Sequence, residues 1–164
     1  MQGVRWTGAL ACVLVAVCVG CTSGSSSSAR SSATRTVERV VDGDTIVVDG
    51  GERVRLIGVD TPETVKPNTP VQCFGREASD YTKSLLPKGT RVRLEFDVRR
   101  TDRYGRTLAY VYRSSDNLFV NADLVRNGYA NVSTIPPDVA HADEFVALAR
   151  EARSANRGLY AACR

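Results

Sequence analysis

The run of residues 36–59, TVERVVDGDTIVVDGGERVRLIGV, constrains the fold of this chain more than any other segment. Apolar and polar residues alternate along it on both sides of Asp49-Gly50-Gly51, and such alternation is typical of β-strands that bury one face. Asp-Gly between two such runs is typical of a β-hairpin, because these residues tolerate the positive φ angles of tight turns. The segment therefore predicts three consecutive strands, over about 36–41, 44–49 and 52–58.

The next part of the chain predicts one helix and two more strands. Residues 73–86, CFGREASDYTKSLL, place apolar side chains at helical spacing, and Pro87 and Gly89 end the run. TRVRLEFDV and RTLAYVYR, at about 90–98 and 106–113, alternate again and are joined by a charged turn. Five short strands with a helix between the third and the fourth are typical of a small closed barrel of the OB type.

Two further helices are predicted near the C-terminus. The first covers about 120–127 and ends at Gly128. The second covers about 139–156, with Asp138 as its N-cap and Gly158 at its end. Its predicted inner face consists of Phe145, Leu148, Ala149 and Ala152. The expected fold class is therefore α+β, mainly β: a five-stranded OB-fold barrel with three helices.

The N-terminal part of the chain is expected to direct export. In residues 1–20, Arg5 precedes the apolar stretch GALACVLVAVCVG, which is shorter than the roughly 20 residues of a membrane-spanning helix and suits a signal peptide. Cys21 then opens a Ser-rich linker, 21–35, ahead of the folded domain, 36–164. This order resembles the lipobox of bacterial lipoproteins. We expect either a lipid anchor on Cys21 in the cell membrane or plain secretion; a retained anchor helix is the third alternative.

Cysteine usage agrees with export. Of five cysteines, only Cys73 and Cys163 remain in the predicted domain, and two such thiols in an exported protein are expected to form a disulfide. Two distant cysteines and the single histidine, His141, do not form a typical zinc site. We expect His141, near a predicted helix start, to be a surface residue.

The charge balance permits a polyanionic partner without requiring one. The chain has 22 Lys and Arg residues against 18 Asp and Glu, a formal net charge of +4. Most of the basic residues are arginines, whose planar fork of donors suits phosphate or carboxylate. The excess of positive charge is too small to identify the partner.

Four acidic side chains occur in two short motifs at the ends of predicted strands. VDGDT contains Asp42 and Asp44, and VDTPE contains Asp60 and Glu63. Without a cysteine or histidine cluster nearby, such carboxylates would make a hard oxygen site suited to calcium or magnesium. Since they would repel one another, a cation or an arginine must lie among them, and Arg55 precedes the second motif.

Each motif also has a simpler structural interpretation. Asp42 and Asp44 could form an Asx turn, and Asp60 could cap a turn or a helix. An EF-hand loop is excluded, because the fifth and twelfth positions counted from Asp42 are Ile46 and Arg53, where oxygen ligands are required.

Five motifs together resemble the staphylococcal-type nuclease (thermonuclease) family, in order and at compatible spacing, from about residue 40 to residue 160. They are VVDGDT, RLIGVDTPE, FGREAS, RRTDRYGRTLAYVY and NADLVRNGYA. The resemblance implies a monomeric, calcium-dependent endonuclease that hydrolyses phosphodiester bonds of DNA and RNA. It also implies low sequence specificity and products that carry 3′-phosphates.

The resemblance implies a set of calcium ligands. Asp44 and Asp60 match the carboxylates that bind the ion directly, and Thr61 matches the residue that adds its main-chain carbonyl. Asp42 and Glu63 match positions that reach the ion largely through water.

Three catalytic residues are implied as well. Glu63 matches the residue that activates or orients the attacking water, and Arg55 and Arg106 match two catalytic arginines. Such arginines can stabilise the charge that builds up on the phosphoryl oxygens in the transition state. Arg106 has an alternative interpretation as a solvated turn residue beside Gly105.

The chain departs from the best-known family pattern near the nucleotide site. Thr134 and Pro136 stand where that pattern has two tyrosines, which leaves base stacking on that side open. Tyr104 still matches and could either stack on substrate or pack in the core. Two rival hypotheses remain: a noncatalytic OB module that binds nucleic acid or a protein, and a disulfide-stabilised interaction lipoprotein.

Overall fold

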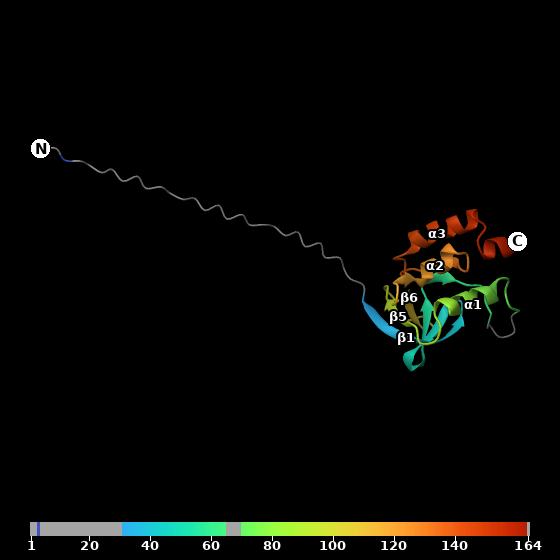
Figure 1. The fold of residues 1–164 in the computed structure, drawn as a ribbon, viewed down its shortest axis with the longest axis horizontal. Helices are drawn as coiled ribbons and strands as arrows, with labels where there is room; N and C mark the ends of the chain where they lie inside the picture. The colour runs from blue at the N-terminus through green and yellow to red at the C-terminus, as the bar shows by residue number, and fades with distance from the viewer. Residues whose placement is uncertain (1–2, 4–30, 65–69, 164) are drawn as a thin grey trace.

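The computed structural model describes residues 3, 31–64 and 70–163, and its centre is a β-barrel (Figure 1). Five strands follow the order β3-β2-β1-β5-β6, and β3 also pairs with β6, which closes the barrel. The β3–β6 pair is parallel, with Val54 opposite Thr107 and Leu56 opposite Ala109, whereas the other barrel pairs are antiparallel. The strands are β1 Ser32–Asp42, β2 Thr45–Val48, β3 Glu52–Leu56, β5 Arg91–Glu95 and β6 Thr107–Arg113. The predicted OB-fold barrel is confirmed.

Three main helices cover the barrel. Figure 1 shows α2 between α3 and the strands, and α1 beside the barrel. The helices are α1 Gly75–Leu85, α2 Val120–Arg126, α3 Ala142–Ser154 and the short α4 Leu159–Ala162. A 3-10 turn, Asp49–Gly51, joins β2 to β3, and β7, Leu118–Phe119, adds a strand beside β6. None of the helices in the described part of the chain has the length and apolar character needed to cross a membrane.

The barrel interior is filled by the inward-facing residues of the alternating strands, as their pattern predicts. Fully buried apolar side chains from the strands include Val37, Ile46, Val48, Val54, Leu56, Val92, Leu94 and Val111. The inner face of α3 is also as predicted, because Phe145, Leu148, Ala149 and Ala152 are its buried residues.

Two predictions at the start of α3 are wrong. The helix begins at Ala142, and Asp138 does not cap it, because its carboxylate instead accepts a hydrogen bond from the main-chain N–H of Arg99 at 2.7 Å. His141 is not a surface residue: its side chain is only 17% exposed. Its ring lies 4.5 Å from that of Tyr110 and 4.8 Å from that of Phe119, measured between centroids. Asp138 is thus held by the β5–β6 connection, whereas His141 packs against aromatic rings of β6 and β7.

The first strand begins earlier than predicted. Ser32–Thr36 pair with Arg91–Glu95 of β5, so part of the predicted linker is strand. Residues 21–30 of that linker lie outside the described residues, as does the predicted signal peptide apart from Gly3.

The predicted third strand is two strands separated by a bend. It ends at Leu56 and continues as β4, Gly58–Asp60, which pairs with β8, Asn131–Ser133, in a separate small sheet. Gly58 has a φ of 78°, and a Cβ there would lie 2.4 Å from Cε2 of Phe145, so the bend requires glycine. This sheet places Asp60 opposite Asn131.

The predicted disulfide between Cys73 and Cys163 is present, and it spans 90 positions in the sequence. It joins the segment just before α1 to the residue just after α4. The C-terminal end of the chain is therefore covalently fixed beside the segment that follows the VDTPE motif.

Candidate active site

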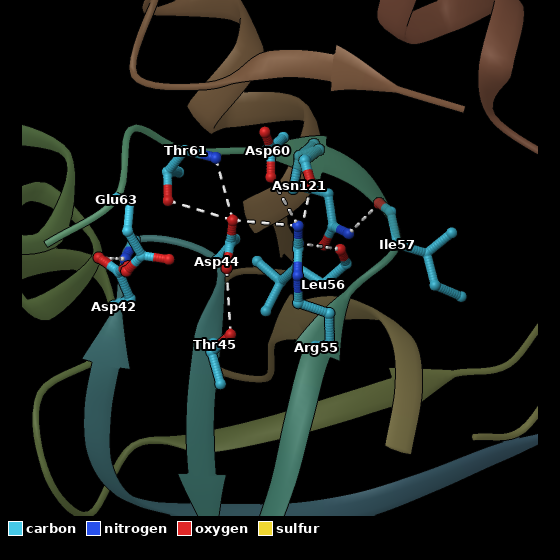
Figure 2. A network of polar contacts seen from close by, with 12 residues as sticks. Asp42, Asp44, Thr45, Arg55, Leu56, Ile57, Asp60, Thr61, Glu63 and Asn121 are labelled. Atoms are coloured by element: carbon cyan, nitrogen blue, oxygen red, sulfur yellow. Dashed lines mark hydrogen bonds and ion pairs between the residues drawn. The ribbon is translucent and has the colours of Figure 1, made fainter. Parts of the chain in front are cut away.

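Arg55 lies at the centre of the candidate site, near the end of β3 (Figure 2). Its NH1 group donates to the main-chain carbonyls of Leu56 at 2.9 Å and Val59 at 2.7 Å. These carbonyls belong to the two sides of the bend between β3 and β4. The two hydrogen bonds to this bend therefore hold the guanidinium group in one orientation.

The other terminal nitrogen of Arg55 bridges two carboxylates, that of Asp44 in the turn between β1 and β2 and that of Asp60 in β4. NH2 lies 3.2 Å from Oδ2 of Asp44 and 3.0 Å from Oδ1 of Asp60. Figure 2 shows both carboxylates directed toward this guanidinium. The structure thus brings together Asp44, Asp60 and Arg55, as their assignment to one site requires.

Asp44 is held tightly by its neighbours. Its Oδ2 accepts hydrogen bonds from the N–H of Thr61 at 2.9 Å and from the Thr61 hydroxyl at 3.2 Å, and its Oδ1 accepts from the Thr45 hydroxyl at 3.0 Å. A Cβ at Gly43 would lie 2.7 Å from the Thr61 side chain. The glycine between the two aspartates therefore allows the VDTPE motif to lie against the VDGDT turn.

Asp42 and Glu63 form a second acidic pair beside the first (Figure 2). Asp42 Oδ1 accepts hydrogen bonds at 2.8 Å from both the N–H of Gly43 and the hydroxyl of Thr64. Burial raises the pKa of Asp42; the Thr64 bond opposes this shift, and the Glu63 carboxyl adds to it. The Gly43 bond joins Asp42 to the next residue and is therefore not the contact of an Asx turn, which would reach the N–H two residues on.

The backbone of Glu63 is held by Gln72. The Gln72 side-chain oxygen accepts from the N–H of Glu63, and the N–H of Gln72 donates to the carbonyl of Glu63, each at 3.0 Å. Because Cys73 directly follows Gln72, the disulfide lies next to these two hydrogen bonds.

The donor set suits a hard cation. Burial raises the pKa of Asp60, Arg55 lowers it, and the negative charges of Asp44 and Glu63 raise it further. Arg55 is an ion-pair partner of two of these carboxylates, Asp44 and Asp60, and oxygen donors of this kind are the ligands that calcium prefers. Within 31–64 and 70–163, however, no three acidic, cysteine or histidine side chains already stand in a metal-binding arrangement. Arg55 occupies the position between Asp44 and Asp60.

Arg106 is positioned by the turn that joins β5 to β6. Its Nε donates to Oδ2 of Asp102 at 2.6 Å, and its N–H donates to Oδ1 at 3.0 Å. Its side chain is 25% exposed, so it is not the fully solvated turn residue of the alternative interpretation. Burial alone would raise the pKa of Asp102, but the hydrogen bonds from Arg106 and Tyr104 lower it below its ordinary value.

Arg55 and Arg106 line the same pocket, which has a volume of about 450 Å³. The carboxylates of the acidic cluster do not line this pocket, so Arg55 is the residue that connects the cluster to it. Tyr104 also lines the pocket and is 68% exposed, so it does not pack in the core. Thr134 is not among the lining residues, whereas its neighbours Ser133 and Ile135 are.

Several supporting residues were not identified from the sequence. Asn121 is fully buried; it donates to the Ile57 carbonyl at 2.8 Å and accepts from the N–H of Val111 at 2.9 Å. Thr64 donates a hydrogen bond to Asp42, and Asp102 accepts one from Arg106. The available signal for Asn121 was a polar residue within a predicted helix. Its hydrogen-bond partners could not be identified from the sequence, because they are distant along the chain.

The fold and site define an OB-type barrel domain that carries an acidic cluster and an arginine-lined pocket connected through one arginine. The chain belongs to the staphylococcal nuclease family: the family described as "Staphylococcal nuclease homologue" matches residues 53–162. Arg55, Asp60, Glu63 and Arg106 lie within that match, and Asp42 and Asp44 precede it.

Individual relatives agree with this assignment. The chain is 56% identical over 105 residues to the thermonuclease of Staphylococcus intermedius, covering 62% of this chain and 61% of the relative. It is 44% identical over 130 residues to the thermonuclease of Staphylococcus hyicus, covering 77% and 75%. It is also 44% identical over 124 residues to Endonuclease YncB of Bacillus subtilis, covering 73% and 57%.

Proposed function

We propose that this protein is a calcium-dependent endonuclease that hydrolyses phosphodiester bonds of DNA and RNA with low sequence specificity. Membership of the staphylococcal nuclease family supports the proposal, as do relatives named thermonuclease and endonuclease. The observation that carries it is the position of Arg55, which contacts the carboxylates of Asp44 and Asp60 and lines the pocket that contains Arg106.

In the proposed reaction, a water oxygen attacks phosphorus and the bond from phosphorus to the 5′ oxygen breaks. Glu63 accepts the proton of the attacking water, and the departing 5′ oxygen takes a proton from solvent water, leaving a 3′-phosphate and a 5′-hydroxyl. General-base assistance of this kind typically contributes 10²- to 10⁴-fold. Arg55 and Arg106 donate hydrogen bonds to the phosphoryl oxygens, where negative charge increases in the transition state.

Asp44, Asp60 and the main-chain carbonyl of Thr61 would hold the calcium ion, with Asp42 and Glu63 reaching it through water. When bound, the ion supplies positive charge that stabilises the phosphoryl oxygens. Asp44 and Asp60 supply oxygen donors of the kind that such binding needs, and the structure brings both of them to Arg55.

The test is cleavage of single-stranded DNA and of RNA by the purified protein, with calcium and with a calcium chelator. We expect chelator-sensitive cleavage, and a loss of at least about 100-fold in kcat for Glu63→Gln, because the general base is removed. Glu151→Gln, an exposed position on α3, is the matched control and should retain full activity. End-group analysis should detect 3′-phosphates. Binding without cleavage in calcium would instead identify a noncatalytic OB module.

We also propose that the protein is exported and carries a lipid on Cys21. The N-terminal sequence and the Cys73–Cys163 disulfide support export, since disulfides persist in oxidising compartments. Mass spectrometry of the mature N-terminus should find a lipid-modified cysteine. An unmodified N-terminus beyond Cys21 would show secretion without an anchor.

A further inference from the structure

Arg99 is an arginine of the β5–β6 connection to which the sequence analysis assigned no role. Its hydrogen-bond and ion-pair partner is Asp138, a residue that is only 5% exposed. The N–H of Arg99 donates to Asp138 Oδ1 at 2.7 Å, and its Nε lies 3.4 Å from Asp138 Oδ2. Its NH2 group also donates to the carbonyl of Pro136. The side chain nevertheless remains 46% exposed, so part of the guanidinium faces solvent.

The exposed part of Arg99 belongs to the same pocket as Arg55 and Arg106. Among the described residues, four arginines line this pocket, the fourth being Arg103, whereas the carboxylates that line it are Asp102 and Asp138. Arg103 donates to the Tyr104 hydroxyl and is not paired with a carboxylate in the described residues. The pocket therefore has an excess of guanidinium groups, and one phosphate does not require all of them.

Two large side chains make part of the pocket wall apolar. Tyr104 is 68% exposed and Ile135 is 61% exposed, although both line a concave surface. A bare inorganic anion gains little from such a wall. A nucleic-acid strand, in which a sugar that carries a base separates successive phosphates, uses both the cationic and the apolar parts.

We propose that Arg99 is a specificity-determining residue that binds the phosphate adjacent to the scissile one, so that the enzyme prefers strands over substrates with a single phosphate. The inference rests on the proposed nuclease function. Arg99 is suited to this contact because Asp138 and the Pro136 carbonyl hold it in place before substrate arrives, which reduces the entropy lost on binding.

The first experiment measures binding without cleavage. A labelled single-stranded DNA decamer is titrated with wild type, Arg99→Ala, Arg99→Lys and Arg150→Ala at several salt concentrations in a chelator. Arg150, exposed on α3, controls for the loss of one positive charge away from the pocket. We expect Arg99→Ala to lower the magnitude of the salt slope of log Kd by about 0.7, the value for one phosphate contact on a single strand. Arg99→Lys should retain most of the slope, and Arg150→Ala all of it.

The second experiment compares kcat/KM on the decamer and on a dinucleoside monophosphate, which has only the scissile phosphate. Arg99→Ala should reduce kcat/KM roughly tenfold on the decamer, the effect of one charge-assisted hydrogen bond, and leave it unchanged on the short substrate. Equal losses on both substrates, or no change in the salt slope, would overturn the proposal. Because Arg99→Lys retains the charge, it tests the same contact if Arg99→Ala folds poorly. A wild-type protein that cleaves neither substrate would refute the nuclease function, while the binding experiment would still test Arg99.

Discussion

Replacing Asn121 with alanine should destabilise the protein more than any exposed polar substitution. The side chain is fully buried and joins two backbone groups from different parts of the fold: the carbonyl of Ile57, as Figure 2 shows, and the N–H of Val111. Alanine leaves both groups buried without these partners. Each unsatisfied group costs about 1–3 kcal/mol, so the expected loss is roughly 2–6 kcal/mol. That is a large part of the stability of a typical small domain.

The measurement is urea unfolding followed by circular dichroism, with Asn131→Ala as the control. Asn131 is exposed on β8, so its substitution should change the free energy of unfolding by no more than about 0.5 kcal/mol. The Asn121 bond to Ile57 also lies between Leu56 and Val59, whose carbonyls hold Arg55. The folded variant should therefore cleave nucleic acid more slowly. A loss below about 1 kcal/mol would refute the view that Asn121 satisfies these two groups.

The remaining predictions concern the disulfide and Asp102. Replacing both Cys73 and Cys163 with serine should lower the free energy of unfolding by up to about 4.6 kcal/mol, the loop-closure value for roughly 90 residues, and reduced wild type should match the variant in urea unfolding. A difference below about 1 kcal/mol would contradict the loop-closure argument. Asp102 has a pKa below its ordinary value of 3.8, so its ionised form stabilises the fold above that pH, and this contribution is lost as the pH falls through the lowered value. Unfolding measured from about pH 5 to pH 2 should show this acid loss in wild type and a smaller one in Asp102→Asn; equal slopes would count against the assignment.

Local patterns determined most of the secondary structure and the identity of the candidate site residues. The alternation around Asp49-Gly50-Gly51 predicts the hairpin, and the spacing of Phe145, Leu148, Ala149 and Ala152 predicts the buried face of α3. Such patterns can be recognised in the sequence because the period of a strand or helix involves residues that are close together along the chain. The motifs likewise identified the acidic residues and Arg55 as candidates before any geometry was known.

Only the tertiary structure decided which of these groups meet. The bend at Gly58 depends on Phe145, and the strand that holds Asp60 depends on pairing with Asn131. Asp138 was predicted to cap a helix, yet it holds Arg99, 39 positions away. A side chain with several potential hydrogen-bond partners bonds to the one that barrel closure and helix packing bring within reach. The spacing of residues in the sequence does not predict which partner that is. For this reason the bridge from Asp44 through Arg55 to Asp60, and the arginine-lined pocket beside it, belong to the folded barrel and not to any single motif.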